Sequence, residues 1–360
     1  MVSRISYFQL MFVILLSNGL TNHVIIIPVL LDVARRDSWL SVLAAGVIYL
    51  IGLVAIYYLY NRLGQKPLIE WLKQKYPPAI TYFVTILLVL YASVLCYITV
   101  KDTVTWVSIS FSPATPVFIT TSFFLFVCYM NSVMGIRSIA MTSGVLLPVV
   151  VVLGFFVMSA NFKHKDYSAL LPIMEDGYQL AIQGIIYCGA GFSEIILLLL
   201  LTSKLKKKMT FTSLLFLGIC LIFLTLGPLV GAIAEFGPDL AAKLRYPAYE
   251  EWRLASLGVF VEHLDFLSIF QWFSGAFIRV SLMLYLVVEA LDLPAGKKRI
   301  SVLTGLYLLV FLLNLLPISD IDFYRALVSF LLPGLLGVSL FVLILLLVLL
   351  SARKSTDGGT

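Results

Sequence analysis

The chain alternates between long apolar runs and short polar connections. Most runs are close to the roughly 20 residues that an α-helix needs to cross a bilayer. The period-two alternation of β-strands in outer-membrane barrels is not seen in the sequence. The pattern predicts an all-α integral membrane protein, with a single transmembrane domain over residues 1–355 and a short polar tail over residues 356–360. About ten segments are predicted to span the membrane, near residues 7–31, 38–61, 80–110, 115–133, 138–160, 180–202, 210–235, 265–291, 300–317 and 326–351.

The composition agrees with a membrane location. Of the 360 residues, 61% are hydrophobic and 12% are charged, whereas a soluble domain is about 45–50% apolar and about 25% charged. Cysteines lie only inside predicted segments, so we interpret them as small buried apolar residues and predict neither disulfides nor a metal site. They are Cys96, Cys128, Cys188 and Cys220.

The net charge is +6, and two short basic clusters, KLKKK at residues 204–208 and GKKR at residues 296–299, carry most of the signal for membrane orientation. Both fall on the cytoplasmic side if the N-terminus is cytoplasmic, as the positive-inside rule requires. An even number of segments then places both termini in the cytoplasm. This distribution favours contact with the lipid bilayer, and we predict no nucleic-acid partner.

The first apolar segment contains an unusual concentration of polar residues, SNGLTNH at residues 17–23. Consecutive residues on an intact helix point about 100° apart and cannot share one face. A break would allow their side chains, and freed backbone groups, to line one cavity. Pro28 predicts a second irregularity because it lacks the N–H that would bond toward residue 24. The predicted ligand-binding residues here are Asn18, Gly19, Thr21, Asn22 and His23.

The sixth segment carries a comparable stretch, YCGAGFSE at residues 187–194. Its glycines lower helix propensity by up to about 1 kcal/mol each and give a ligand access to the backbone. The alternative is that small residues simply allow close helix packing. We favour a break because an acidic residue follows in the same segment. The predicted ligand-binding residues are Gly189, Gly191, Ser193 and Glu194.

These two interrupted segments occupy matching places in two halves of five segments each, about 7–160 and 180–351. An odd number of segments per half inverts the second half in the membrane. Paired interruptions of this kind are the sequence signature of secondary transporters with inverted repeats and a ligand site at the midplane. We therefore predict two inverted five-helix repeats with broken helices 1 and 6.

Charged residues inside the segments also indicate function by default. Glu194 and Arg279 are predicted to face the interior of the bundle and to pair, either for a ligand or as a structural ion pair. Tyr97 is a further candidate for the ligand site, although a core aromatic is the simpler reading. Lys101 and Asp102 are interpreted as a pair near the outer end of the third segment.

Soluble-enzyme motifs such as GxxxxGK[ST], HExxH, GxSxG and CxxC do not occur in the sequence. We therefore predict that the protein is not an enzyme and uses no cofactor. A proton relay through His23, Glu194 and Arg279 is an open alternative to ligand binding.

Several stretches resemble one family, the B subunits of the spore germination nutrient receptors. They are ISYFQL and IPVL in the first segment, the turn ARRDSWLS, and YSALLPIMEDGYQLAIQGIIYCGAGFSEIILLL entering the sixth. The resemblance covers nearly the whole chain. Its most specific part is Pro172 and Gly177, followed by Gly191, Phe192 and Glu194.

The resemblance implies the fold of the amino acid–polyamine–organocation superfamily, with two inverted five-helix repeats. It also implies germinant sensing in the spore inner membrane, with a receptor A subunit and a lipoprotein C subunit as partners and a small nutrient, such as an amino acid or a sugar, as ligand. Superfamily members carry Gly-x-Gly in the broken first helix, where this chain has Thr21, Asn22 and His23. Side-chain recognition would then replace capture by the backbone.

Three functions stay open at this point. The chain is a receptor subunit that passes a ligand signal to its partners, a secondary transporter of amino acids or related solutes, or a structural scaffold. The fold does not separate them, because one fold supports many functions.

Overall fold

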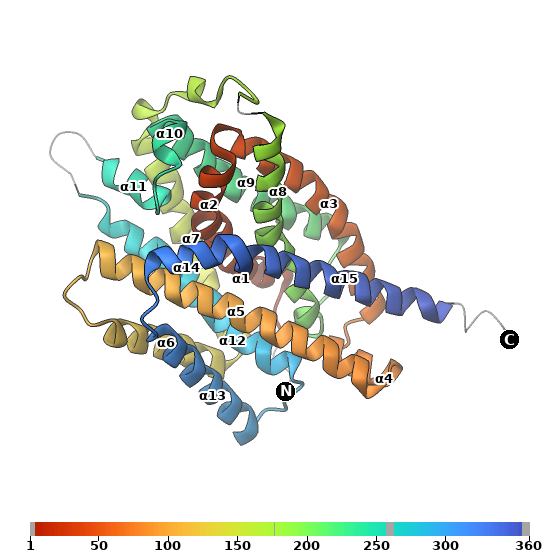
Figure 1. Ribbon diagram of the computed structural model, residues 1–360. Helices are drawn as coiled ribbons and strands as arrows, with labels where there is room; N and C mark the ends of the chain where they lie inside the picture. The colour runs from red at the N-terminus through yellow and green to blue at the C-terminus, as the bar shows by residue number, and fades with distance from the viewer. Residues whose placement is uncertain (1–3, 176, 257–262, 355–360) are drawn as a thin grey trace.

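The computed structural model describes residues 4–175, 177–256 and 263–354, which are almost entirely helical (Figure 1). Within these ranges the only β-structure is an isolated bridge between Ile5 and Leu205. The predicted tail, residues 356–360, lies outside the described residues. In chain order, with η marking 3₁₀- and π-helices, the elements are α1 (Tyr7–Leu20), η1 (Thr21–Ile25), α2 (Ile26–Ala34), η2 (Arg35–Asp37), α3 (Ser38–Leu63), α4 (Leu68–Lys75), α5 (Pro78–Ser110), α6 (Val117–Met134), α7 (Ile136–Ala160), η3 (Phe162–His164), η4 (Tyr167–Leu170), α8 (Tyr178–Phe192), η5 (Ser193–Lys204), α9 (Phe211–Phe236), α10 (Pro238–Ala241), α11 (Pro247–Leu254), α12 (Phe266–Ala290), α13 (Lys297–Asn314), α14 (Asp320–Ala326), η6 (Leu327–Leu331) and α15 (Leu332–Lys354).

Eight helical runs in the described ranges are long and apolar enough to cross a membrane. The first, Tyr7–Leu63, contains the first two predicted segments, which η2 separates at Arg35 with its φ of 46°. α13, over the predicted segment near 300–317, is not among the eight. The chain is thus a multi-pass, all-α membrane protein, while ten segments in two inverted repeats stay a prediction. The runs are Tyr7–Leu63, Pro78–Ser110, Val117–Met134, Ile136–Ala160, Tyr178–Lys204, Phe211–Phe236, Phe266–Ala290 and Asp320–Ser351.

The centre of the bundle is α12, which packs against α1, α5, α6 and α7. Most of α12 is buried, whereas little of α7 is buried and it presents exposed apolar side chains such as Val145 and Phe155. Because lipid tails are as apolar as leucine, such side chains have no reason to turn inward.

The first segment changes its geometry at the predicted polar stretch. α1 passes into the π-helix η1, where the N–H of Ile26 donates to the carbonyl of Thr21, and then into α2. Pro28 lacks the N–H that an α-helix would bond to residue 24, which favours a wider turn just before it. The predicted unwinding of this stretch was wrong, because the backbone keeps its hydrogen bonds by adopting the π geometry.

The sixth segment changes in the other direction. α8 ends at Phe192, and η5 continues as a 3₁₀-helix for 12 residues. Runs of 3₁₀-helix longer than about four residues are uncommon, and in the middle of a helix they often mark a hinge or a strained sequence. The predicted break at residues 187–194 is thus a switch from α- to 3₁₀-helix rather than an unwound loop.

The two ends of the bundle are tied by different contacts. At one end, called the α4 end, Lys206 N donates to the carbonyl of Ile5 (2.9 Å) and Tyr76 donates to the carbonyl of Leu349 (2.5 Å). At the other, called the α11 end, Arg245 binds Asp102 of α5 at 2.6 Å and Asp320 of α14. At both ends, chain segments from distant parts of the sequence are thus held together, and Figure 1 shows α4 and α11 on opposite sides of the bundle.

Candidate functional site

A buried ion pair lies at the centre of the bundle. Glu194, the second residue of η5, accepts two hydrogen bonds from Arg279 of α12, at 2.6 and 2.7 Å. Arg279 also donates to Thr99 of α5 (2.8 Å) and to the carbonyl of Ser17 in α1 (3.0 Å). The predicted contact between Glu194 and Arg279 is therefore present, and it joins four helices at one point.

This pair is arranged for burial. Arg279 is 0% exposed, and removing two charges from water costs several kcal/mol per ion unless geometry and further hydrogen bonds compensate. The two parallel bonds from the guanidinium to the carboxylate are the strongest form that such a pair takes. Thr99 and the carbonyl of Ser17 accept two further bonds, so four of the five guanidinium N–H groups have protein partners.

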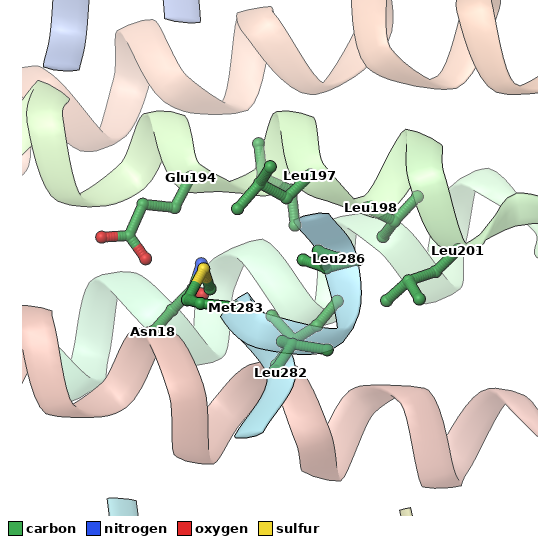
Figure 2. Close-up of a pocket in the computed structure, with 10 residues that line it drawn as sticks. Asn18, Glu194, Leu197, Leu198, Leu201, Leu282, Met283 and Leu286 are labelled. Atoms are coloured by element: carbon green, nitrogen blue, oxygen red, sulfur yellow. The ribbon is translucent and has the colours of Figure 1, made fainter. Parts of the chain in front are cut away.

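A cavity opens beside Glu194, between η5, α1 and α12. Its free volume is about 10 Å³, and it is lined by Ile14, Asn18, Glu194, Ile195, Leu197, Leu198, Leu201, Leu282, Met283 and Leu286. Figure 2 shows Glu194 and Asn18 together at one end, while leucines of η5 and α12 form the rest of the wall. About 10–15 Å³ of such volume is needed to hold one water molecule, so the cavity is contracted in this conformation and a nutrient has to widen it to bind.

Polar side chains of the first segment are buried near this site without satisfying partners. Asn22 is 0% exposed, and neither its Oδ1 nor its Nδ2 has a hydrogen-bond partner within the described ranges. The same holds there for Asn18 Nδ2, Ser17 Oγ and Thr21 Oγ1. Burying a polar group without a partner costs about 1–3 kcal/mol in proteins. This much unsatisfied hydrogen-bonding capacity in one helix indicates a place that a ligand or water occupies.

The glycines of the sixth segment have different neighbours. A Cβ at Gly191 would overlap Asn22 Oδ1 and Ile26, so this glycine lets η1 and α2 approach α8. Gly189 instead faces Leu336 of α15, at 3.3 Å from a Cβ built on it. Gly191 therefore lies beside residues of the first segment. Gly189 instead allows close helix packing, which was the alternative considered for these glycines.

The residues of TNH do not line one cavity. His23 Nδ1 lies 3.3 Å from the carbonyl of Leu224, and a Cβ on Gly19 would lie 2.9 Å from the same leucine, so both face α9. Asn22 faces α8. Without unwinding, the helical rotation between consecutive residues separates their side chains. The prediction that Asn22 and His23 share one cavity was therefore wrong.

Tyr97 lies away from the cavity lining and stacks edge-on against Phe323 of α14, with ring centroids 6.4 Å apart. The residues of α5 that reach the site are Thr99, through Arg279, and Tyr91, whose hydroxyl lies 3.4 Å from Ser193 Oγ. Ser193 also donates to the carbonyl of Ala190. Sequence reasoning missed Tyr91 and Thr99, although their spacing of eight residues places them on one helix face.

The predicted pair of Lys101 and Asp102 was also wrong. Lys101 donates to the carbonyl of Ile318 (2.9 Å), whereas Asp102 is buried and binds Arg245. Adjacent helical residues point about 100° apart, so each finds a partner on a different segment.

Comparison with known proteins covers the whole of this site. A family model described as "Spore germination protein" (Spore_permease) matches residues 2–323. The chain is also similar to "Spore germination protein XB" of Bacillus anthracis, with 43% identity over 343 residues that cover 95% of this chain and 96% of that protein. Every candidate residue from Asn18 to Arg279 falls within the range matched by the family model.

Proposed function

Because the chain belongs to the spore germination protein family, we propose that it is the membrane subunit of a germinant receptor. In this proposal it binds a small nutrient near the middle of the bilayer and signals to partner subunits. The partners are a receptor A subunit and a lipoprotein C subunit, and the location is the spore inner membrane. The basic clusters at residues 204–208 and 296–299 support a cytoplasmic α4 end, and hence cytoplasmic termini.

One observation carries the proposal of nutrient binding. Asn22 is fully buried beside Gly191, and both polar atoms of its amide lack hydrogen-bond partners in the described structure. A buried amide with no partner is costly, and a structural role alone gives no reason to retain it. Asn18 lines the cavity, and its Nδ2 also has no hydrogen-bond partner among the described residues.

The distribution of polar and apolar residues in the cavity wall favours an amino acid over a sugar. Polar groups gather at the end formed by Asn18 and Glu194, and the rest of the wall is leucine, isoleucine and methionine. A sugar carries hydroxyls around its whole ring and would leave several unpaired against such a wall. An amino acid with a small apolar side chain places its charged groups together at one end.

Signalling is supported by the geometry of η5. This helix contributes Glu194, Ile195, Leu197, Leu198 and Leu201 to the cavity wall. A 3₁₀-helix rises about 2.0 Å per residue and an α-helix 1.5 Å, so relaxation of 12 residues toward α-helix shortens the segment by roughly 6 Å. A ligand that pushes on η5 would thereby move Lys204 at the α4 end.

The proposal is tested with spores that lack this protein and are complemented with its Asn22→Ala variant. A panel of L-amino acids and hexoses serves as germinants. We expect the variant to need at least about tenfold more of the effective nutrient, which corresponds to about 1.4 kcal/mol of lost binding energy. The matched control is Asn314→Ala on α13, another buried asparagine with an unpartnered amide oxygen in the described part of the chain. An unchanged nutrient response in Asn22→Ala would refute the site.

The second candidate is a secondary transporter. The observation that favours it is the departure from α-helix at η1 and at η5. These elements fall in the first and sixth of the ten proposed segments. They therefore occupy matching places in the proposed repeats, residues 7–160 and 180–351. Uptake of a labelled amino acid into proteoliposomes by this chain alone would support transport. Nutrient binding without uptake, together with loss of germination on deletion, would support the receptor.

A further inference from the structure

A second group of buried charges lies at the α11 end, on residues that do not line the cavity. Lys165 follows η3, Glu235 is near the end of α9, and Glu251 belongs to α11. Lys165 Nζ lies 3.7 Å from Glu235 Oε2 and 3.5 Å from Glu251 Oε2. The three side chains are 3%, 0% and 8% exposed. Two carboxyl groups thus share one ammonium group out of contact with water.

The hydrogen bonding within this cluster is incomplete. Within the described ranges neither oxygen of Glu235 has a hydrogen-bond partner, nor has Glu251 Oε1. If all three groups were ionised, the cluster would carry one uncompensated negative charge. An isolated buried charge is so costly that the group takes up a proton instead, and two carboxyl groups at one site cannot easily both ionise.

Hydrogen bonds to backbone carbonyls hold the segments that carry these three residues in place. Asp166 N donates to the carbonyl of Ala234 (2.7 Å), which fixes the Lys165 segment on α9. Asn161 donates to the carbonyl of Glu251 (2.6 Å), which fixes α11 on the end of α7. At Gly231, a Cβ would lie 3.0 Å from Lys165 Nζ and 3.3 Å from Glu251 Oε1, so the missing side chain makes room for both groups.

We propose that Lys165, Glu235 and Glu251 form a proton-binding site, in which the two carboxyl groups together hold one proton beside the charged lysine. The proton comes from water at the α11 end and bonds to a carboxylate oxygen. Its release returns it to water and leaves the net negative charge in place. No redox partner or other reactant is involved.

The titration of Glu251 supports this assignment. Burial raises the pKa of Glu251 to about 7, although the nearby Lys165 opposes the rise. An acid whose folded-state pKa exceeds its unfolded value stabilises the fold most below the unfolded pKa, and this contribution is lost as the pH rises through the folded pKa. The attachment of α11 to α9 and α7 is therefore expected to weaken as the pH rises through about 7.

Other charged groups near the cluster have partners of their own. On the elements packed against it, Asp166 bonds to Ser168 N, Glu250 pairs with Arg253 on the outer face of α11, Tyr249 bonds to Asp265, and His23 of η1 lies against the carbonyl of Leu224. None of these bonds reaches Lys165, Glu235 or Glu251 in the described structure. The charge balance of the site thus rests on the three residues themselves.

Infrared spectroscopy of the full-length protein in lipid nanodiscs tests the proposal. We expect the carbonyl stretch of one protonated carboxyl group, which disappears as the pH rises between about pH 5 and 9. Glu235→Gln and Glu251→Gln should each remove this signal completely, because the remaining carboxylate then pairs one-to-one with Lys165. Glu250→Gln, an acidic neighbour on the outer face of α11, should leave it unchanged.

A charge variant gives a second, independent result. Lys165→Met removes the positive charge, so the signal should persist to a pH at least about one unit higher. The wild-type spectrum by itself decides the question if a variant fails to fold: absence of a titrating carboxyl signal overturns the proposal. It is likewise overturned if the signal persists in both Glu235→Gln and Glu251→Gln.

Discussion

Glu194 and Arg279 stand out in the sequence because a charge inside an apolar segment is costly and rare. Their remaining contacts were not predictable, since Thr99 and the carbonyl of Ser17 come from helices far apart in the chain. Asn22 shows the same limit: its polarity was visible, but its position beside Gly191 follows only from packing. The sequence therefore identified which residues need partners, and the fold supplied the partners.

The ion pair makes a prediction at this scale. Glu194→Leu or Arg279→Met alone leaves one buried charge unpaired and should lower the free energy of unfolding by about 3–5 kcal/mol. The double variant should recover most of this loss but should not respond to nutrient, because Glu194 lines the cavity. Unfolding in detergent and germination assays measure the two effects.

Lys73→Gln is the control, because it breaks the exposed contact of Lys73 with Asp292, and such surface pairs contribute about 0–1 kcal/mol. A double variant that folds and still responds to nutrient would make the Glu194–Arg279 pair purely structural.

At the scale of whole elements, irregular geometry in the first and sixth segments was expected, but its form was not. We predicted unwound backbone, and the chain has a π-helix in η1 and a 3₁₀-helix in η5. Inside a bilayer an unwound segment leaves N–H and C=O groups unsatisfied unless a cavity receives them. The π-helix and the 3₁₀-helix both keep the backbone hydrogen bonds. Polar composition therefore predicts where a helix departs from α geometry but not which geometry replaces it.

The 3₁₀-helix leads to a second prediction. Lys204 ends η5 and binds Glu289 of α12 at 2.7 Å, while its carbonyl accepts from Ile5 N at 2.8 Å. Lys204→Gln should remove the ion pair with Glu289 that fixes η5 at the α4 end. Nutrient should then still bind, but germination should be reduced several-fold. Binding to the purified protein and germination of spores separate the two steps.

Lys207→Gln, in the exposed part of the same basic cluster, is the matched control. Equal losses of binding and germination in Lys204→Gln would argue against transmission through η5, because the substitution would then act on the site itself.

At the scale of the whole molecule, contacts between distant segments hold both ends of the bundle together. At the α11 end, Arg245 joins Asp102 of α5 to Asp320 of α14, and its guanidinium also stacks on Tyr246 and Tyr324. Burial lowers the pKa of Arg245, but the facing Asp102 and Asp320 outweigh it and raise the pKa overall. Arg245 therefore stays charged across the physiological pH range and holds α5 and α14 together at this end.

Arg245→Ala should open the α11 end. A cysteine placed at Asn22 is then expected to react several-fold faster with a membrane-impermeant thiol reagent than the same cysteine in the unaltered background. Arg253→Ala is the control, because Arg253 is exposed and pairs only locally with Glu250. Equal labelling rates in both backgrounds would show that Arg245 does not limit access.

The sequence by itself determined the class of the protein and the places of interest within it. Apolar runs of bilayer length leave no alternative to membrane-spanning helices, and polar or charged residues within those runs mark positions that need a partner. Only the tertiary structure decided which partners these are. It separated His23 from Asn22, added Thr99 and Ser17 to the predicted pair of Glu194 and Arg279, and brought Lys165, Glu235 and Glu251 together from three segments. The physical reason is that burial and hydrogen bonding depend on neighbours from distant helices, which local periodicity does not contain.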